Sequence, residues 1–259
     1  MKDQKKTPKR KPNIKKAVLL CVAFVAIPAL IFLGVVAFDD RMYLWISICI
    51  AVLACLPFFI SFELRNGSPK KRGISPETDC GATEAQNGKG TTRLIILASM
   101  TALSVLGRFI FTPLPFFKPV TAIVVITGMY LGAESGFLCG ALSALLSNIM
   151  FGQGPWTPFQ MFTWGMIGLF AGLMAGILKR NRIILSVFGV LAGVLFSFTM
   201  DIWTVLWWDG KFTLSRYLAA LASAAGVTVI YAVSNVIFLW LLARPLGSKL
   251  ERIIVKYGV

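Results

Sequence analysis

The sequence predicts an all-α membrane protein with eight spans, two in an N-terminal hairpin and six in a following bundle. Three observations support this prediction. Hydrophobic residues make up 57% of the 259 residues, and the mean hydropathy is +0.77. Charged residues make up only 14%, well below the roughly 25% of an ordinary soluble domain. Several apolar runs approach the roughly 20 residues that a helix needs to cross a bilayer.

The charge and the residue types exclude several function classes. The net charge is +15, but the basic residues are confined to segments between apolar runs. No zinc-finger spacing or basic stripe occurs, so we expect no nucleic-acid binding. The chain has no histidine and its five cysteines form no C-x-x-C pair. Ser-His catalysis and His-ligated metal sites are therefore excluded, and no metal site is expected.

The first elements are a basic segment and a hairpin. Residues 1–16 form a basic N-terminus, and the apolar runs 17–38 and 42–62 form a transmembrane hairpin over residues 17–62. A cleaved signal peptide is the alternative for the first run, but its roughly 21 apolar residues exceed the 7–15 of a signal core. Residues 63–92 are rich in Pro, Gly and charge, and they predict a flexible cytoplasmic linker.

The remaining chain predicts a six-helix membrane core over residues 93–243 and a cytoplasmic tail over residues 244–259. The second and third helices of the core are short, and short hydrophobic segments mark the binding site in several transporter folds. The six predicted spans are 93–111, 119–132, 136–151, 158–179, 183–206 and 215–243.

The distribution of Lys and Arg predicts the topology. With the N-terminus in the cytoplasm, 21 of the 26 Lys and Arg residues lie in inner segments. This is a strong positive-inside bias, and it predicts a multi-pass cell-membrane protein with both termini in the cytoplasm. Segments 108–119, 151–158 and 203–216 then lie on the outer face.

Aromatic residues gather in or near these outer segments. The stretch 151–160, FGQGPWTPFQ, is an island of turn formers, amides and aromatics between two apolar runs. An interfacial aromatic belt is the alternative explanation, but a belt would also populate the inner face. We therefore expect some of these rings to line a ligand pocket. Five of the seven tryptophans belong to this group: Trp156, Trp164, Trp203, Trp207 and Trp208.

Polar side chains near the same face complete a candidate binding site. Asn148, Gln153 and Gln160 can donate and accept hydrogen bonds without carrying a charge. Tyr231 and Asn235 share a helix face at i, i+4 spacing and would line either a pocket or a helix contact.

A single carboxylate, Asp201, lies in the apolar run 196–206. An intramembrane carboxylate is costly, and it suggests a functional site. Arg108 and Arg216 are its expected partners, and a purely structural ion pair is the alternative.

Small residues recur at the spacing of closely packed helices. Ala98 and Ala102 begin the six-helix core and present a small face that a second protein can contact. The glycines that we expect to pack the bundle itself are Gly128, Gly132, Gly136 and Gly140, followed by Gly168, Gly172 and Gly176.

Several of these motifs together resemble the substrate-binding S components of energy-coupling factor (ECF) vitamin transporters. The resemblance covers residues 91–257, and its most specific part is the loop 151–161, which is most similar to a branch assigned to cobalamin uptake. The other matching motifs are Ala98-x-x-x-Ala102, Phe117-Lys118-Pro119-Val120, Thr127-Gly128, Met200-Asp201 and Ala243-Arg244-Pro245.

The resemblance implies a six-helix S-component bundle, here preceded by an extra hairpin. Such a subunit captures a vitamin outside and docks through Ala98 and Ala102 on a coupling subunit with two cytoplasmic ATPases. It binds no cofactor itself, and its partners use ATP. Consistently, Gly88-Lys89-Gly90-Thr91 lacks the spacing of a phosphate-binding loop. The expected substrate-binding residues are Phe117, Asn148, Gln153, Trp156, Gln160, Trp164, Asp201, Trp208 and Asn235.

Three alternatives stay open on the residues alone. Aromatic rings, amides and one carboxylate suit a large, planar and mostly uncharged ligand, so riboflavin or another small vitamin fits as well as a corrinoid. A membrane-embedded lipid-processing enzyme would use Asp201. A self-contained carrier would need a run of charged pore residues, which the sequence lacks.

Overall fold

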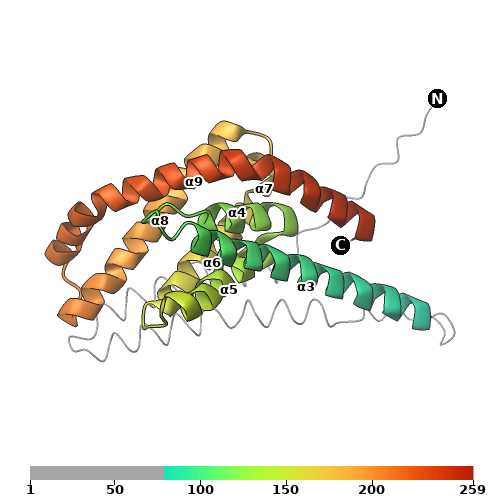
Figure 1. Cartoon of the computed structure of the whole chain (residues 1–259), viewed down its shortest axis with the longest axis horizontal. Coiled ribbons are helices and arrows are strands. Elements are labelled where there is room, and N and C mark those ends of the chain that lie inside the picture. The colour runs from blue at the N-terminus through green and yellow to red at the C-terminus, as the bar shows by residue number, and fades with distance from the viewer. Residues whose placement is uncertain (1–78, 259) are drawn as a thin grey trace.

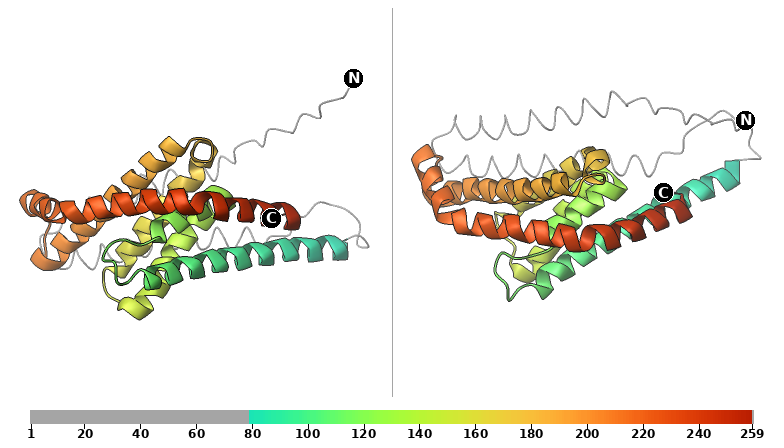
Figure 2. Two further views of the ribbon diagram at one scale, coloured as in Figure 1. Left: turned by 45° about the horizontal axis from the view of Figure 1, so that its top comes forward. Right: turned by 90° about the horizontal axis from the view of Figure 1, so that it is seen from above.

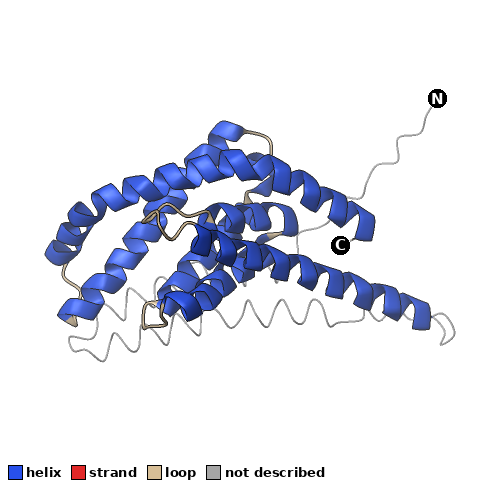
Figure 3. Ribbon diagram, viewed as in Figure 1, coloured by secondary structure: helices blue, strands red, loops and turns tan. Residues whose placement is uncertain are grey.

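The computed structural model describes residues 79–258, and every regular element in that range is a helix (Figures 1 and 3). The predicted basic N-terminus, the hairpin 17–62 and most of the predicted linker lie outside the described residues. The helices are α3 (Asp79–Ile110), α4 (Val120–Leu131), α5 (Ala133–Phe151), α6 (Thr157–Leu173), α7 (Ala175–Leu178), α8 (Arg182–Asp209) and α9 (Leu214–Tyr257).

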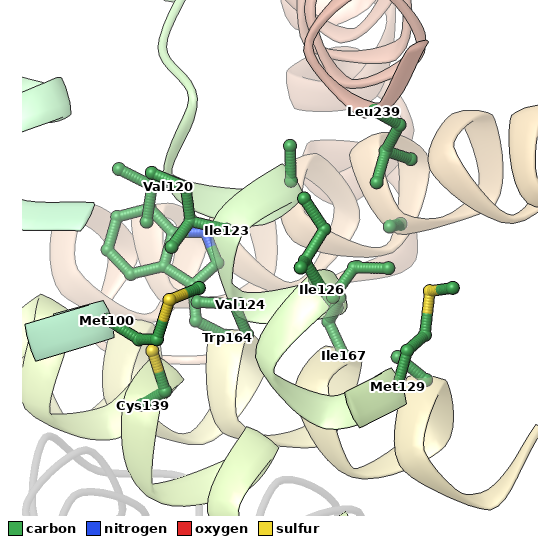
Figure 4. Packing of buried hydrophobic residues seen from close by; sticks show 14 of the residues in the cluster. Met100, Val120, Ile123, Val124, Ile126, Met129, Cys139, Trp164, Ile167 and Leu239 are labelled. Atoms are coloured by element: carbon green, nitrogen blue, oxygen red, sulfur yellow. The ribbon is translucent and has the colours of Figure 1, made fainter. Parts of the chain in front are cut away.

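The short helix α4 is the centre of the bundle. It contacts each of the other described helices, and all of its 12 residues except Tyr130 are buried. In Figure 4, its side chains lie among Met100 of α3, Cys139 of α5, Trp164 of α6 and Leu239 of α9. The long helix α9 arches along one side of the bundle next to α8, and α3 projects beyond the bundle (Figures 1 and 2).

The prediction of eight spans is not supported. Within residues 79–258, four helices are long and apolar enough to cross a membrane: Gly90–Ile110 of α3, and the whole of α5, α8 and α9. The apolar runs at α4 and α6 form helices of only 12 and 17 residues. Both runs are buried by neighbouring helices, and a helix enclosed by protein has the same apolar composition as a helix enclosed by lipid.

Two helix ends differ from the predicted boundaries. Helix α3 begins at Asp79, inside the predicted linker, although Gly81, Gly88 and Gly90 disfavour a helix there. Helix α9 continues through Pro245 to Tyr257, across the predicted tail. Beyond Pro245, Leu246, Leu250 and Ile254 follow helical spacing and pack against the core. This packing offsets the hydrogen bond that a proline removes from a helix.

Helices α4, α5 and α6 pack with their backbones in direct contact, as the glycine spacing predicts. An added Cβ at Gly128 or Gly136 would overlap the carbonyl oxygen of Gly168, and a Cβ at Gly168 would overlap that of Gly136. No side chain fits between these helices at this level. By contrast, Gly176 has open space around it and does not take part in this packing.

We predict that Gly168→Ala destabilises the protein, because the added methyl group overlaps the backbone of α5. Overpacking of this kind costs roughly 1–3 kcal/mol. The matched control is Gly226→Ala in α9, where an added Cβ meets no atom within 4 Å. Alanine restricts the unfolded backbone more than glycine does, so this variant gains up to about 1 kcal/mol of stability. Thermal melting in detergent measures the stability of both purified variants. Equal melting temperatures for the two variants would contradict the packing argument.

Candidate functional site

A cavity of about 190 Å³ lies between α3, the loop 111–119, α4, α6, α8 and α9. The segments that form it are widely separated in the sequence, so only the folded bundle brings them together. Its lining is aromatic, amide and cationic, without an acidic residue: Arg108, Phe116, Lys118, Val120, Thr121, Gln160, Trp164, Gly193, Phe196, Tyr231 and Asn235.

Aromatic rings form a continuous wall of this cavity. Trp164 stacks on Phe196, with ring centroids 4.8 Å apart and an interplanar angle of 16°. Phe196 meets Tyr231 edge-on at 5.2 Å, and Tyr231 meets Phe116 edge-on at 5.8 Å. Such a wall offers π-faces and ring edges to a flat ligand.

Two cations, Arg108 and Lys118, reach the cavity from either end of the α3–α4 connection. The Arg108 guanidinium lies 5.3 Å from the ring centroid of Trp164 and 4.8 Å from that of Phe151. The Lys118 ammonium lies 5.1 Å from the Phe151 ring centroid. Partial burial lowers the pKa of Lys118, and the positive charge of Arg108 lowers this pKa further. Two neighbouring cations without an acid in the lining favour a ligand with hydrogen-bond acceptors or negative charge.

Asn148 holds the polar side of the cavity in place. Its side chain is 1% exposed, and its Oδ1 accepts a hydrogen bond from Arg108 Nη1 at 2.8 Å. Its Nδ2 donates to Gln160 Oε1 at 2.8 Å and to Thr157 Oγ1 at 2.9 Å. Arg108 Nη1 also donates to Ser147 Oγ. One buried amide therefore links α3, α5 and α6 and orients two residues of the lining.

The amides of the lining present complementary hydrogen-bonding groups. Gln160 uses its Oε1 to accept from Asn148, which leaves its NH₂ group to donate to a ligand. Asn235 uses its Nδ2 to donate to the Gly189 carbonyl at 3.1 Å, which leaves its Oδ1 to accept. A ligand with both acceptors and an N–H or O–H donor fits these groups.

Five of the predicted substrate-binding residues lie at or next to the cavity. Gln160, Trp164 and Asn235 line it, and Asn148 lies directly behind Arg108 and Gln160. Phe117 lies between the lining residues Phe116 and Lys118 in the sequence, and its ring packs on Phe238, with ring centroids 5.1 Å apart.

The other four predicted residues do not line the cavity. Gln153 donates to the Leu145 carbonyl at 2.8 Å and so helps to close the loop before α6. Trp156 meets Trp203 edge-on, with ring centroids 5.7 Å apart. Trp208 is 75% exposed on α8. The fourth, Asp201, lies on α8 outside the lining.

The predicted ion pairs of Asp201 are wrong. Arg108 binds Ser147 and Asn148 instead, and Arg216 pairs with Asp209 at 3.4 Å. The buried Oδ2 of Asp201 has no hydrogen-bond partner within the described part of the chain. Proximity along the outer helix ends does not determine which way a side chain points.

Sequence reasoning missed several residues of the lining. Phe116, Lys118, Thr121, Gly193 and Phe196 were not predicted as site residues. Arg108 was predicted only as a partner of Asp201. The two cations could have been predicted from the sequence, because Arg108 and Lys118 lie on either side of an otherwise uncharged segment rich in aromatic and proline residues.

A family model, described as the S component of ECF-type riboflavin transporters, matches residues 89–252. The chain belongs to this family. No curated protein and no solved structure matches it. S components are transporter subunits that work with a coupling subunit and ATPases, so the predicted ECF S-component family is confirmed. The predicted cobalamin-type branch is not confirmed, because the matching model describes riboflavin transporters.

We predict that Asn148→Leu lowers the melting temperature of this S component. The substitution removes hydrogen bonds from Arg108, Thr157 and Gln160, and each buried polar group left without a partner costs roughly 1–3 kcal/mol. Gln153→Leu is the matched control, because Gln153 is exposed and water can replace its partners. If both variants melt at the same temperature, Asn148 does not organise the site.

Proposed function

We propose that this S component binds riboflavin in the cavity between α3, α4, α6, α8 and α9 and supplies it to an ATP-driven importer. The observation that carries the proposal is the aromatic wall facing two cations, in a cavity without an acidic lining residue. Riboflavin has a planar tricyclic ring with carbonyl acceptors and one imide N–H donor, together with a hydroxylated chain.

Each part of riboflavin has a suitable group in the lining. The ring stacks among Trp164, Phe196 and Tyr231. Its carbonyl oxygens accept hydrogen bonds from the cations, and its imide N–H donates to the free Oδ1 of Asn235. The hydroxyls of the chain bond with Gln160 and Thr121. The family match to riboflavin transporters independently supports this ligand.

Cobalamin is the second candidate, supported by the resemblance of the loop 151–161 to a cobalamin-type branch. A corrin ring with its peripheral amides is far larger than riboflavin. The cavity of about 190 Å³ would therefore have to open further for cobalamin than for riboflavin. The predicted residues Gln153, Trp156, Asp201 and Trp208 lie outside the cavity, so they would contact cobalamin only in a site that extends beyond it.

The distribution of charge supports an outward-facing cavity. Lys179, Arg180 and Arg182 follow α7 at the opposite end of the bundle from Thr121. By the positive-inside rule we place that end in the cytoplasm, so that the cavity opens outside. We propose that the chain binds no cofactor and that its partner ATPases supply the energy.

Docking on the coupling subunit is proposed for the exposed face of α3. Ala98 and Ala102 are exposed, whereas Leu97 and Thr101 on the other side of the helix are buried. Small side chains let a partner helix approach closely in lipid. No residue of the described range covers this face.

A lipid-processing enzyme has less support. Acid–base chemistry needs a titratable group within hydrogen-bond reach of the substrate. Asp201, the carboxylate on which this alternative rests, lies outside the cavity.

We predict that the purified chain binds riboflavin with quenching of flavin fluorescence, and that Trp164→Leu weakens binding about thirtyfold or more, as loss of a buried aromatic anchor does. Trp208→Leu is the matched control and should leave the affinity unchanged, because Trp208 is 75% exposed away from the cavity. Equilibrium dialysis against cobalamin tests the second candidate. Tight binding of cobalamin without binding of riboflavin would overturn the proposal. A large loss of affinity in Trp208→Leu would show that the ligand binds outside this cavity, near the outer end of α8.

We predict that the double variant Ala98→Phe/Ala102→Phe abolishes riboflavin uptake and co-purification with the coupling subunit. The bulky rings hold a partner helix away, while Ala98 and Ala102 do not line the cavity, so riboflavin affinity is retained. Ala222→Phe, at an exposed alanine of α9, is the control and should leave uptake unchanged. Normal uptake by the double variant would exclude this face as the docking surface.

A further inference from the structure

A second cavity, of about 170 Å³, lies at the C-terminal end of α4, beside the start of α8 and the middle of α9. On α4, Thr121 lines the first cavity and Tyr130 lines the second. Nine residues of helix separate them, which is about 13 Å. The lining of the second cavity is cationic and aromatic above an apolar floor: Met129, Tyr130, Leu178, Lys179, Arg180, Arg182, Leu185, Leu239, Trp240, Ala243 and Arg244.

We propose that this second cavity binds the phosphate group of an anionic phospholipid. Four cations, Lys179, Arg180, Arg182 and Arg244, converge on it from the α7–α8 connection and from α9. The one carboxylate paired with them in the described range is Glu251, at 4.0 Å from Lys179. The cavity therefore keeps a surplus of positive charge, and Arg groups bind phosphate oxygens in bidentate geometry.

Aromatic rings hold two of these cations at the cavity. The Lys179 ammonium lies 4.1 Å from the Tyr130 ring centroid, and the Arg182 guanidinium lies 5.9 Å from that of Trp240. Trp240 is itself held by a hydrogen bond from its Nε1 to Ser186 Oγ at 2.7 Å. Arg180 and Arg244 form no ion pair with any residue between 79 and 258, so their charges are available to a ligand.

The surroundings of the cavity favour a lipid over a free phosphate ion. Its floor is made of the buried side chains Leu178, Leu185 and Leu239. Ile183 on α8 and Leu241 on α9, the sequence neighbours of the lining residues Arg182 and Trp240, are 73% and 62% exposed, and both helices are long enough to span the membrane. A phosphate at the cations would thus sit directly beside apolar helix surface that can contact acyl chains. Basic pockets between helices at the cytoplasmic side recognise anionic head groups in this way.

The experiment compares two triple variants of the full chain in nanodiscs that contain equal amounts of phosphatidylglycerol and phosphatidylcholine. Arg180→Gln/Arg182→Gln/Arg244→Gln removes three charges from the cavity. The control, Lys249→Gln/Arg252→Gln/Lys256→Gln, removes three charges from exposed positions near the end of α9 that do not line the cavity. Native mass spectrometry counts the lipids that stay bound after release from the nanodiscs.

We expect the wild-type protein and the control to retain phosphatidylglycerol in preference to phosphatidylcholine. The cavity variant should lose this preference by about tenfold or more, given the worth of each basic residue near an anionic lipid. The melting temperature of the cavity variant shows whether this variant folds. If it does not fold, the single variant Arg244→Gln takes its place and should lose part of the preference. Equal loss of preference in both triple variants would overturn the proposal, because a general basic surface would then account for it. Displacement of the lipid by millimolar glycerol phosphate would also overturn the lipid assignment, in favour of a soluble phosphate compound.

Discussion

The direct contact between the backbones of α4, α5 and α6 is the constraint on which the rest of the structure depends. It requires that Gly128, Gly136 and Gly168 have no side chain, since an added Cβ at each would overlap a backbone atom of a neighbouring helix. Because these helices approach so closely, α4 can lie inside the bundle with contacts to every other described helix. Its two ends then reach the two cavities, so one packing level positions both candidate binding sites.

Much of this fold could be predicted from the sequence, because helix packing in lipid leaves a readable pattern of small residues. The predicted span 119–132 and the observed α4 differ by one residue at each end. The extensions of α3 and α9 could not be predicted in the same way. A charged segment beyond Pro245 has the composition of a solvated tail, and only the packing of Leu246 and Leu250 on the core shows that it continues the helix.

The site was less predictable than the fold, because composition shows which residues are present but not where their side chains point. Gln160, Trp164 and Asn235 were identified and do line the cavity. The clustering of tryptophans was a poorer guide, since Trp208 is exposed on α8. Asp201 was weighted by the cost of a charge in lipid, yet it lies outside the lining. A carboxylate is therefore not the organising charge of this site.

That role belongs to Arg108, and the way it is held determines the charge that the cavity presents. Its partners are the neutral groups of Ser147 and Asn148, so hydrogen bonds orient the guanidinium without cancelling its charge. A carboxylate in the place of Asn148 would neutralise Arg108 and remove the attraction for acceptor atoms. In the second cavity a carboxylate does pair with a cation, because Glu251 lies beside Lys179. The surplus positive charge there comes from the three arginines of the lining. Both cavities thus keep positive charge that no lining carboxylate cancels, and the first adds an aromatic wall and amides, which suit a flat ligand rich in acceptors.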